Sequence, residues 1–193
     1  MKERIEKIIG AAAKNIWMGT FHSVFAKILR FEADKIGYPS NFTIYDSDDS
    51  KALLRRIIKG MSLDTDIYKV NIVASRISSF KNNLITVKAY NNNTELKTQD
   101  DSAHRPQMGV LYETYVKECF KSGAMDFDDL LLKTNELIFR FPEVLHKYQD
   151  RFRYILVDEY QDTNHSQYLI VKALASRFEN LCVVGDDAQS IYA

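Results

Sequence analysis

The sequence predicts an α/β fold in which a parallel sheet is interrupted by an inserted all-helical block. Two apolar runs, over 154–159 and 181–185, flank a helical pattern over 166–178. Strand, helix and strand joined by short links form a unit whose strands pair in parallel through a right-handed crossover. Residues 46–124, in contrast, show helical spacing of apolar side chains and no convincing strand. The helical block therefore separates two parts of one α/β domain.

The first 45 residues alternate helical and extended patterns. Apolar side chains recur at helical spacing over 2–14, and the run 16–20 is typical of a short buried strand. A helix follows, with Ser23 as its candidate N-cap and an end near Gly37. Residues 42–45 form a second short extended piece.

The helical block opens with the acidic segment 46–50, which favours the positive end of a helix dipole. Further helices are predicted over 70–80 and 107–122, and the segment 90–94 between them is rich in turn residues. A helix from 127 to about 141 then leads back toward the α/β part.

Composition places the chain among ordinary globular proteins. Of its 193 residues, 46% are hydrophobic and 27% are charged. The two cysteines lie far apart in the sequence, which favours reduced thiols and a cytoplasmic location. The N-terminus has no apolar signal segment, and no apolar run is long enough to span a bilayer, so we expect no membrane partner.

Charge is balanced overall but unevenly distributed. Residues 126–193 carry 12 acidic and 7 basic side chains, although the whole chain has a net charge of zero. The zero total excludes a simple argument that the whole chain binds polyanions. Clustered carboxylates repel one another unless a cation joins them, so the acidic C-terminal third could bind a cation. Alternatively, its basic partners could come from sequence outside this chain.

Two adjacent acids follow the first apolar run. Asp158 and Glu159 come at the predicted carboxyl end of a strand, where open α/β sheets bind ligands. Phosphoryl transfer needs a metal carrier and a group that orients or deprotonates the attacking water, and adjacent carboxylates can supply both. The second run repeats the arrangement, because a turn at Gly185 and Asp186 follows it.

Four motifs now stand in one order. They are GTFHS at 19–23, DFDDL at 126–130, DEYQDTN at 158–164 and VGDDAQSIY at 184–192. Together they resemble the UvrD/Rep/PcrA family of superfamily 1 DNA helicases over essentially the whole chain. An Asp-Glu pair alone is a weak signal, but the last two motifs separated by one helix are a specific one.

The resemblance implies a partial RecA-like P-loop NTPase sheet. Residues 1–45 and 125–193 would form a partial RecA-like 1A domain that lacks the Walker A strand, and residues 46–124 a helical 1B subdomain. The pattern G-x-x-x-x-G-K-[ST] is absent, since the run GAAAK at 10–14 has neither the second glycine nor a hydroxyl after the lysine. We therefore expect a fragment of an ATP-dependent DNA helicase that is inactive without its remaining domains. An uncovered sheet edge would favour self-association.

The resemblance also implies roles for single residues. Asp158 would hold Mg²⁺, Glu159 would accept a proton from the attacking water, and Gln189 would contact the γ-phosphate of ATP. The path of single-stranded DNA would be lined by Thr20, Phe21, His22, Ser23 and the stacking residue Tyr192. In the family the helical subdomain can touch duplex DNA ahead of a junction, and here Lys51, Arg55, Arg56 and Lys59 form a basic face that could do so. A run of charges is more often simply a solvated face.

Other interpretations of these residues remain open. Asp126, Asp128 and Asp129 could be metal ligands, but capping of a helix is the preferred interpretation. The chain could also be a non-catalytic module that binds DNA or another protein. A third possibility is a metal-dependent nuclease that uses the aspartate clusters.

Overall fold

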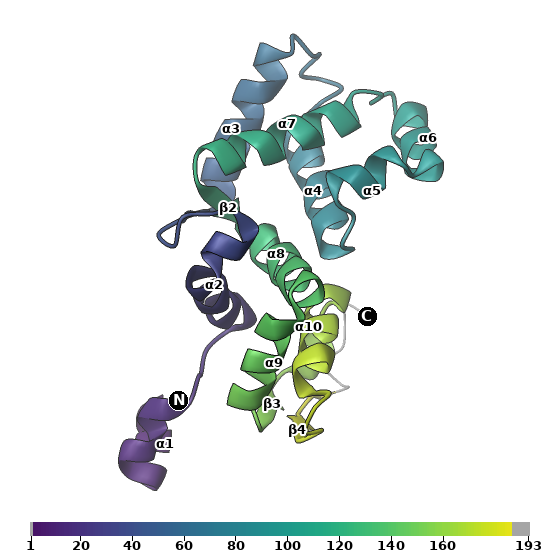
Figure 1. The fold of residues 1–193 in the computed structure, drawn as a ribbon. Helices are drawn as coiled ribbons and strands as arrows, with labels where there is room; N and C mark the ends of the chain where they lie inside the picture. The colour runs from purple at the N-terminus through teal and green to yellow at the C-terminus, as the bar shows by residue number, and fades with distance from the viewer. Residues whose placement is uncertain (1, 187–193) are drawn as a thin grey trace.

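The computed structural model describes residues 2–186 and shows a mostly helical protein with two short parallel sheets. Figure 1 shows helices α3 to α7 gathered at one end, α8 running through the middle, and α9, α10, β3 and β4 at the other end. The predicted site residues Gln189 and Tyr192 lie outside the described residues. None of the described helices is long and apolar enough to cross a membrane.

The elements follow one another in an order that agrees with the predicted fold class. In chain order they are α1 (Lys2–Ile9), η1 (Gly10–Asn15), α2 (Phe21–Phe31), η2 (Ala33–Ile36), β1 (Thr43–Tyr45), α3 (Ser47–Gly60), α4 (Val70–Asn82), α5 (Val87–Asn91), α6 (Thr94–Ser102), α7 (Met108–Lys121), β2 (Ala124–Asp126), α8 (Phe127–Arg140), α9 (Pro142–Arg151), β3 (Ile155–Val157), η3 (Tyr160–Asp162), α10 (His165–Ala175) and β4 (Leu181–Val183).

The N-terminal segment differs from the prediction in two ways. Residues 16–20 are not a strand, because no described strand pairs with them, and they lead from η1 into α2. The cap of α2 is Thr20 rather than Ser23, since the helix begins at Phe21 and the Thr20 side chain accepts the Ser23 backbone N–H. Helix α1 lies apart from the rest of the molecule (Figure 1).

A two-stranded parallel sheet stands where the helical block begins and ends. Strand β1 precedes the block and β2 follows it, and they pair through Thr43 with Ala124, Ile44 with Met125, and Tyr45 with Asp126. The two ends of the block are thereby held side by side. The turn-rich segment 90–94 contains the end of α5 and the start of α6, two short helices that the sequence did not predict, and only residues 92–93 lie between them.

Two hydrophobic cores lie on either side of this sheet. One is built within the helical block, around Tyr112, Met108, Leu111 and Phe80. The other joins α2 to α8, α9 and α10, and its members include Ile28, Leu29, Leu137, Tyr148 and Ile170. The chain therefore buries apolar surface in two places, and burial of this kind is the main favourable term in folding.

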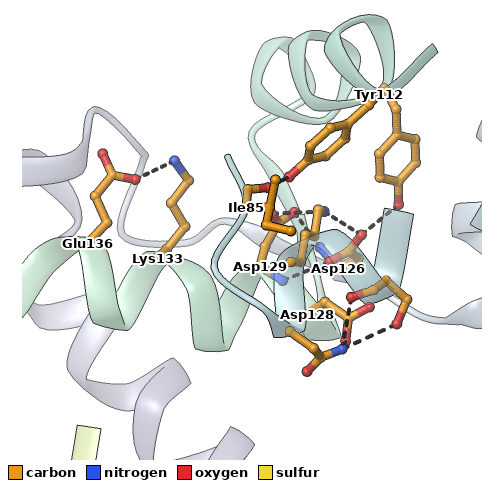
Figure 2. Close-up of polar contacts among 11 residues, drawn as sticks. Ile85, Tyr112, Asp126, Asp128, Asp129, Lys133 and Glu136 are labelled. Atoms are coloured by element: carbon orange, nitrogen blue, oxygen red, sulfur yellow. Dashed lines mark hydrogen bonds and ion pairs between the residues drawn. The ribbon is translucent and has the colours of Figure 1, made fainter. Parts of the chain in front are cut away.

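A buried ion cluster connects the helical block to α8. Lys81, at the end of α4, is fully buried, and its Nζ lies 2.7 Å from Asp126 Oδ2 and 2.8 Å from Asp129 Oδ1. The Tyr115 hydroxyl donates a further hydrogen bond to Asp126 Oδ2 at 2.8 Å (Figure 2). Burial alone would lower the pKa of Lys81, but the carboxylates of Asp129 and Asp126 outweigh it and raise the pKa. The lysine is therefore held charged.

The same two aspartates cap α8, as the preferred interpretation had it. Asp126 is the N-cap and its Oδ1 accepts the Asp129 backbone N–H at 2.8 Å, while Asp129 Oδ2 accepts the Asp126 backbone N–H at 3.2 Å. This reciprocal arrangement satisfies two backbone donors at the helix start. With Lys81 as their cation, these carboxylates form a structural cluster.

The second parallel sheet pairs β3 with β4, which confirms the predicted strand–helix–strand unit. Its register matches Ile155 with Leu181 and Val157 with Val183. A continuous apolar run is typical of a parallel strand that is buried on both faces, but these two strands are not. In β3 Val157 is buried and Leu156 is 77% exposed, and all three residues of β4 are exposed in the described part of the chain. Cys182 is likewise exposed, whereas Cys119 is buried.

Replacing Lys81 with methionine should leave two buried carboxylates without their cation. Removal of one partner from a buried pair typically costs about 3–5 kcal/mol, so we expect a loss of that order in the free energy of unfolding, measured by chemical denaturation. Lys117→Met, which removes an exposed i,i+4 partner of Glu113, is the matched control and should change little. Equal stability of the two variants would contradict a structural role for the cluster.

The cluster should also leave a signature in the pH dependence of stability. Burial and then the carboxylate of Asp126 raise the pKa of Asp129 from 3.8 to about 6. Between these pH values the folded chain binds more protons than the unfolded chain, so this group adds stability as the pH falls from 7 to 4. We expect the stability of the wild type to rise relative to that of Asp129→Asn as the pH falls over that range, measured by chemical denaturation. A wild-type stability that stays constant or falls relative to that of Asp129→Asn would refute the assignment.

Candidate nucleotide site and nucleic-acid interface

The acids predicted for the nucleotide site lie at the carboxyl end of β3. Asp158 and Glu159 directly follow the strand and both are exposed. The Glu159 backbone N–H donates to Asp158 Oδ1 at 3.1 Å. Glu159 has φ 52° and ψ 43°, the left-handed conformation that non-glycine residues rarely adopt. Such strain persists only where the surroundings impose it, and it concentrates at functional sites.

Backbone hydrogen bonds bring the end of β4 to the same edge of the sheet as the two acids. This edge, formed by Asp158, Glu159 and the turn at Gly185, is called the rim. Val184 N–H donates to Val157 O at 2.8 Å, and Tyr160 N–H donates to Val184 O at 2.9 Å. The pairing of the two strands therefore continues past Val157, and the chain that follows β4 runs beside η3. The acids and the turn at Gly185 share one edge of the sheet, as the parallel pairing predicted.

One side chain bridges the two motifs at this rim. Gln161 Nε2 donates to Glu159 Oε2 at 2.6 Å, and Gln161 Oε1 accepts the Asp186 backbone N–H at 3.2 Å. Gly185 permits this approach, because a Cβ placed there would lie 2.9 Å from Gln161 Oε1. Gln161 belongs to the motif DEYQDTN, from which no role for it was predicted; its position two residues after the predicted base was the available signal.

A second polar connection links the strand-end motif to the helical block. Asn164 caps α10 by accepting the Gln167 backbone N–H at 2.9 Å, and its Nδ2 donates to Asn82 Oδ1 at 2.9 Å. Asn82 Nδ2 in turn donates to Asp128 Oδ1 at 2.8 Å. Three segments far apart in the sequence thus meet around Asn82, the last residue of α4. No sequence pattern marked Asn82 in advance.

The residues predicted to line a DNA path begin helix α2. Thr20 is the N-cap, with its Oγ1 accepting the Ser23 backbone N–H at 3.3 Å, and the Ser23 hydroxyl donates to Thr20 O at 2.8 Å. Both residues are exposed. A helix N-terminus that presents hydroxyls and backbone N–H groups favours phosphate oxygens. Phe21 points differently, since it is half-buried and packs against Phe25 with ring centroids 5.7 Å apart.

His22 lies against an exposed aromatic ring from a different motif. The ring of Phe127, the first residue of α8, is 5.5 Å from the imidazole in an edge-on arrangement, and Phe127 is 49% exposed. Burial lowers the pKa of His22, and the carboxylate of Asp128 partly opposes this effect. No role in DNA contact was predicted for Phe127, although its exposed ring offers a face on which a base could stack.

A cavity of about 370 Å³ opens beside Phe127, between the helical block and the start of α8. Its polar lining combines serine hydroxyls and one lysine of α3 and α4 with the aspartates Asp46, Asp126 and Asp128. The polar lining residues from these two helices include Ser47, Ser50, Lys51, Ser75 and Ser78. Lys51, predicted as part of a basic face, therefore turns into this cavity rather than outward with Arg55 and Lys59, which are exposed. Arg56 approaches Glu118 at 3.8 Å.

The carboxylates do not gather into a closed metal centre. Within residues 2–186 no group of three or more His, Cys, Asp or Glu side chains is placed to hold a metal ion. Asp126 and Asp129 are engaged by Lys81, and Asp128 accepts from Asn82. Metal-dependent nuclease chemistry based on these aspartates therefore lacks support in the described residues.

The sequence of the chain matches a known family of helicase domains. Residues 1–193 match the family described as UvrD/REP helicase N-terminal domain, and the chain belongs to that family. Its relatives include the ATP-dependent DNA helicase PcrA of Staphylococcus aureus, 44% identical over 192 residues, and that of Staphylococcus epidermidis, 42% identical over 192 residues. Each alignment covers 100% of this chain and 26% of the relative. The chain thus spans about a quarter of their length.

The proximity of Asp128 to His22 can be tested by titration. Because the Asp128 carboxylate favours the charged imidazole, Asp128→Asn should lower the pKa of His22 further, while the oxygen of the new amide can still accept from Asn82. The pKa is measured from the imidazole carbon-bound proton shifts by NMR. Asp101→Asn in α6, at the far end of the helical block (Figure 1), is the control. An unchanged pKa in Asp128→Asn would show that the two side chains do not interact.

Proposed function

We propose that this chain is the N-terminal motor portion of an ATP-dependent DNA helicase that moves along single-stranded DNA. The observation that carries the proposal is the shared rim of β3 and β4, where Glu159 and the turn at Gly185 are joined through Gln161. Residues 1–45 and 125–193 are assigned to a partial RecA-like domain 1A, and residues 46–124 to a helical subdomain 1B. The rest of the nucleotide site comes from other parts of the helicase.

The two carboxylates at the rim are assigned different roles in ATP hydrolysis. Glu159 is assigned as the acceptor of the proton from the water that attacks the γ-phosphate of ATP. Asp158 is assigned to Mg²⁺, and its exposed carboxylate fits that role because Mg²⁺ takes one or two carboxylates together with phosphate oxygens and waters. The ion supplies charge neutralisation during phosphoryl transfer. Gln189, outside the described residues, is assigned to the γ-phosphate from its place in the motif alone.

The start of α2 and the neighbouring ring of Phe127 are assigned to single-stranded DNA. Thr20 and Ser23 offer exposed polar groups at a helix N-terminus, where a phosphate is favoured. The edge-on contact holds Phe127 beside His22, so a base could stack on the exposed ring. Tyr192 is assigned to the same path from its motif.

The proposed partners are ATP, single-stranded and junction DNA, and the remaining helicase domains. The exposed apolar side chains of β3 and β4, which include Leu156 and Val183, offer a surface for those domains. In their absence the same surface would favour self-association. A cytoplasmic location is consistent with these partners.

The proposal is tested by ATP hydrolysis in the complete helicase and in this chain alone. We expect DNA-stimulated turnover by the complete protein and none by residues 1–193, because the Walker A pattern is absent from this sequence. Glu159→Gln should lower kcat by about 10²–10⁴-fold, the usual contribution of a general base.

Glu143→Gln is the matched control, since it makes the same chemical change on α9, where Glu143 contacts Lys35. It should leave kcat unchanged. Full turnover by Glu159→Gln, or turnover by the isolated chain that survives this substitution, would refute the assignment of the base.

A further inference from the structure

The amide of Gln161 uses its donor and its acceptor on two different motifs. The donor is directed at Glu159 Oε2 and the acceptor at the Asp186 backbone N–H, at 2.6 Å and 3.2 Å respectively. Few side chains can do this, because only an amide presents a donor group and an acceptor oxygen on one rigid plane. A carboxylate would lack the donor, and a lysine would lack the acceptor.

The hydrogen bonds of the Gln161 side chain do not stabilise the local secondary structure. It lies in η3, and the residue before that turn, Glu159, makes no side-chain cap. The hydrogen bonds that hold η3 and the start of α10 are made by backbone groups and by the Asn164–Gln167 capping box. Both hydrogen bonds of the Gln161 side chain end instead on the rim itself.

Gly185 adds an independent observation. An added Cβ would lie 2.9 Å from Gln161 Oε1 and 3.5 Å from Gln161 N. The first distance is shorter than real Cβ contacts, so a larger residue would displace the amide oxygen, whereas the second is ordinary contact. The glycine therefore leaves space for the amide of Gln161.

We propose that Gln161 is a positioning residue that aims the carboxylate of Glu159 and ties it to the turn after β4. This inference rests on the proposed function, in which Glu159 accepts the proton. By donating to Oε2, the amide fixes the plane of the carboxylate and leaves Oε1 to receive the proton from water. By accepting from Asp186 N–H, the same amide keeps that carboxylate in register with the segment that leads toward Gln189. Holding a reacting group in one geometry is a large component of catalysis.

The structural half of the inference is tested on this chain by amide hydrogen exchange. Gln161→Ala should accelerate exchange at the Asp186 N–H, because its acceptor is lost. Unchanged exchange in Gln161→Ala would overturn the bridge whether or not the complete protein hydrolyses ATP.

The catalytic half is tested in the complete helicase by separating kcat from KM. Loss of a hydrogen bond to a charged group corresponds to about a 10- to 100-fold fall in kcat, which we expect for Gln161→Ala with KM for ATP and thermal stability unchanged. Gln161→Glu should lose at least as much, since it removes the donor and sets a like charge beside Glu159.

Two further variants make the result specific. Gln167→Glu is the matched control, because glutamate serves equally well at this position of a capping box, and it should retain full kcat. Gly185→Ala should lower kcat by displacing the amide, and should add little to Gln161→Ala, because the two changes remove one interaction.

The outcomes separate this inference from the proposed function. A complete helicase in which Glu159→Gln abolishes turnover but Gln161→Ala retains wild-type kcat would sustain the function and overturn the role of Gln161. Two further results would also overturn it. One is a fall in kcat that is fully explained by a smaller folded fraction of Gln161→Ala at the assay temperature. The other is additivity of the effects of Gly185→Ala and Gln161→Ala.

Discussion

The ion cluster around Lys81 is the constraint on which the arrangement of the helical block depends. Asp126 is at once the last residue of β2, the N-cap of α8 and a partner of Lys81. One carboxylate therefore joins the consecutive elements β2 and α8 to Lys81 of α4, which lies 45 residues earlier in the chain. Buried ion pairs contribute little net stability compared with apolar packing, but a buried charge without its partner is costly. Alternative placements of α4 against α8 would leave such a charge and are therefore disfavoured.

Next to this cluster, Asn82 connects the nucleotide rim to the candidate DNA surface. It follows Lys81 directly, and its side chain reaches both Asn164 and Asp128. Asp128 in turn acts electrostatically on His22. At the end of α4, Lys81 thus anchors the helical block, and the next residue, Asn82, contacts both candidate surfaces. A continuous set of contacts is a route by which two sites can influence one another. The strength of that influence is measured as a coupling free energy.

The sequence predicted most elements because their patterns are local. The helix of α10 between two apolar runs, the acidic start of α3 and the cap of α8 all follow from residue spacing within a few turns. Residues 16–20 were misassigned because an apolar run becomes a strand only beside a partner strand. The burial of Lys81 and the bridge made by Gln161 depend on contacts between segments distant in the chain, which no local pattern contains. The motif DEYQDTN predicted Asp158 and Glu159 as site residues. It did not predict the hydrogen bonds that orient them.

The pairing of β1 with β2 has a consequence for how such proteins can diversify. Because the residues that enter and leave the helical block are hydrogen-bonded neighbours, Tyr45 beside Asp126, the block is attached like a side loop whose ends meet. Chain segments with adjacent ends tolerate replacement and changes in length well. A segment of another length could replace the helical block at this point without moving β3 and β4. The helical block could therefore change in evolution independently of the strands that carry the proposed nucleotide site.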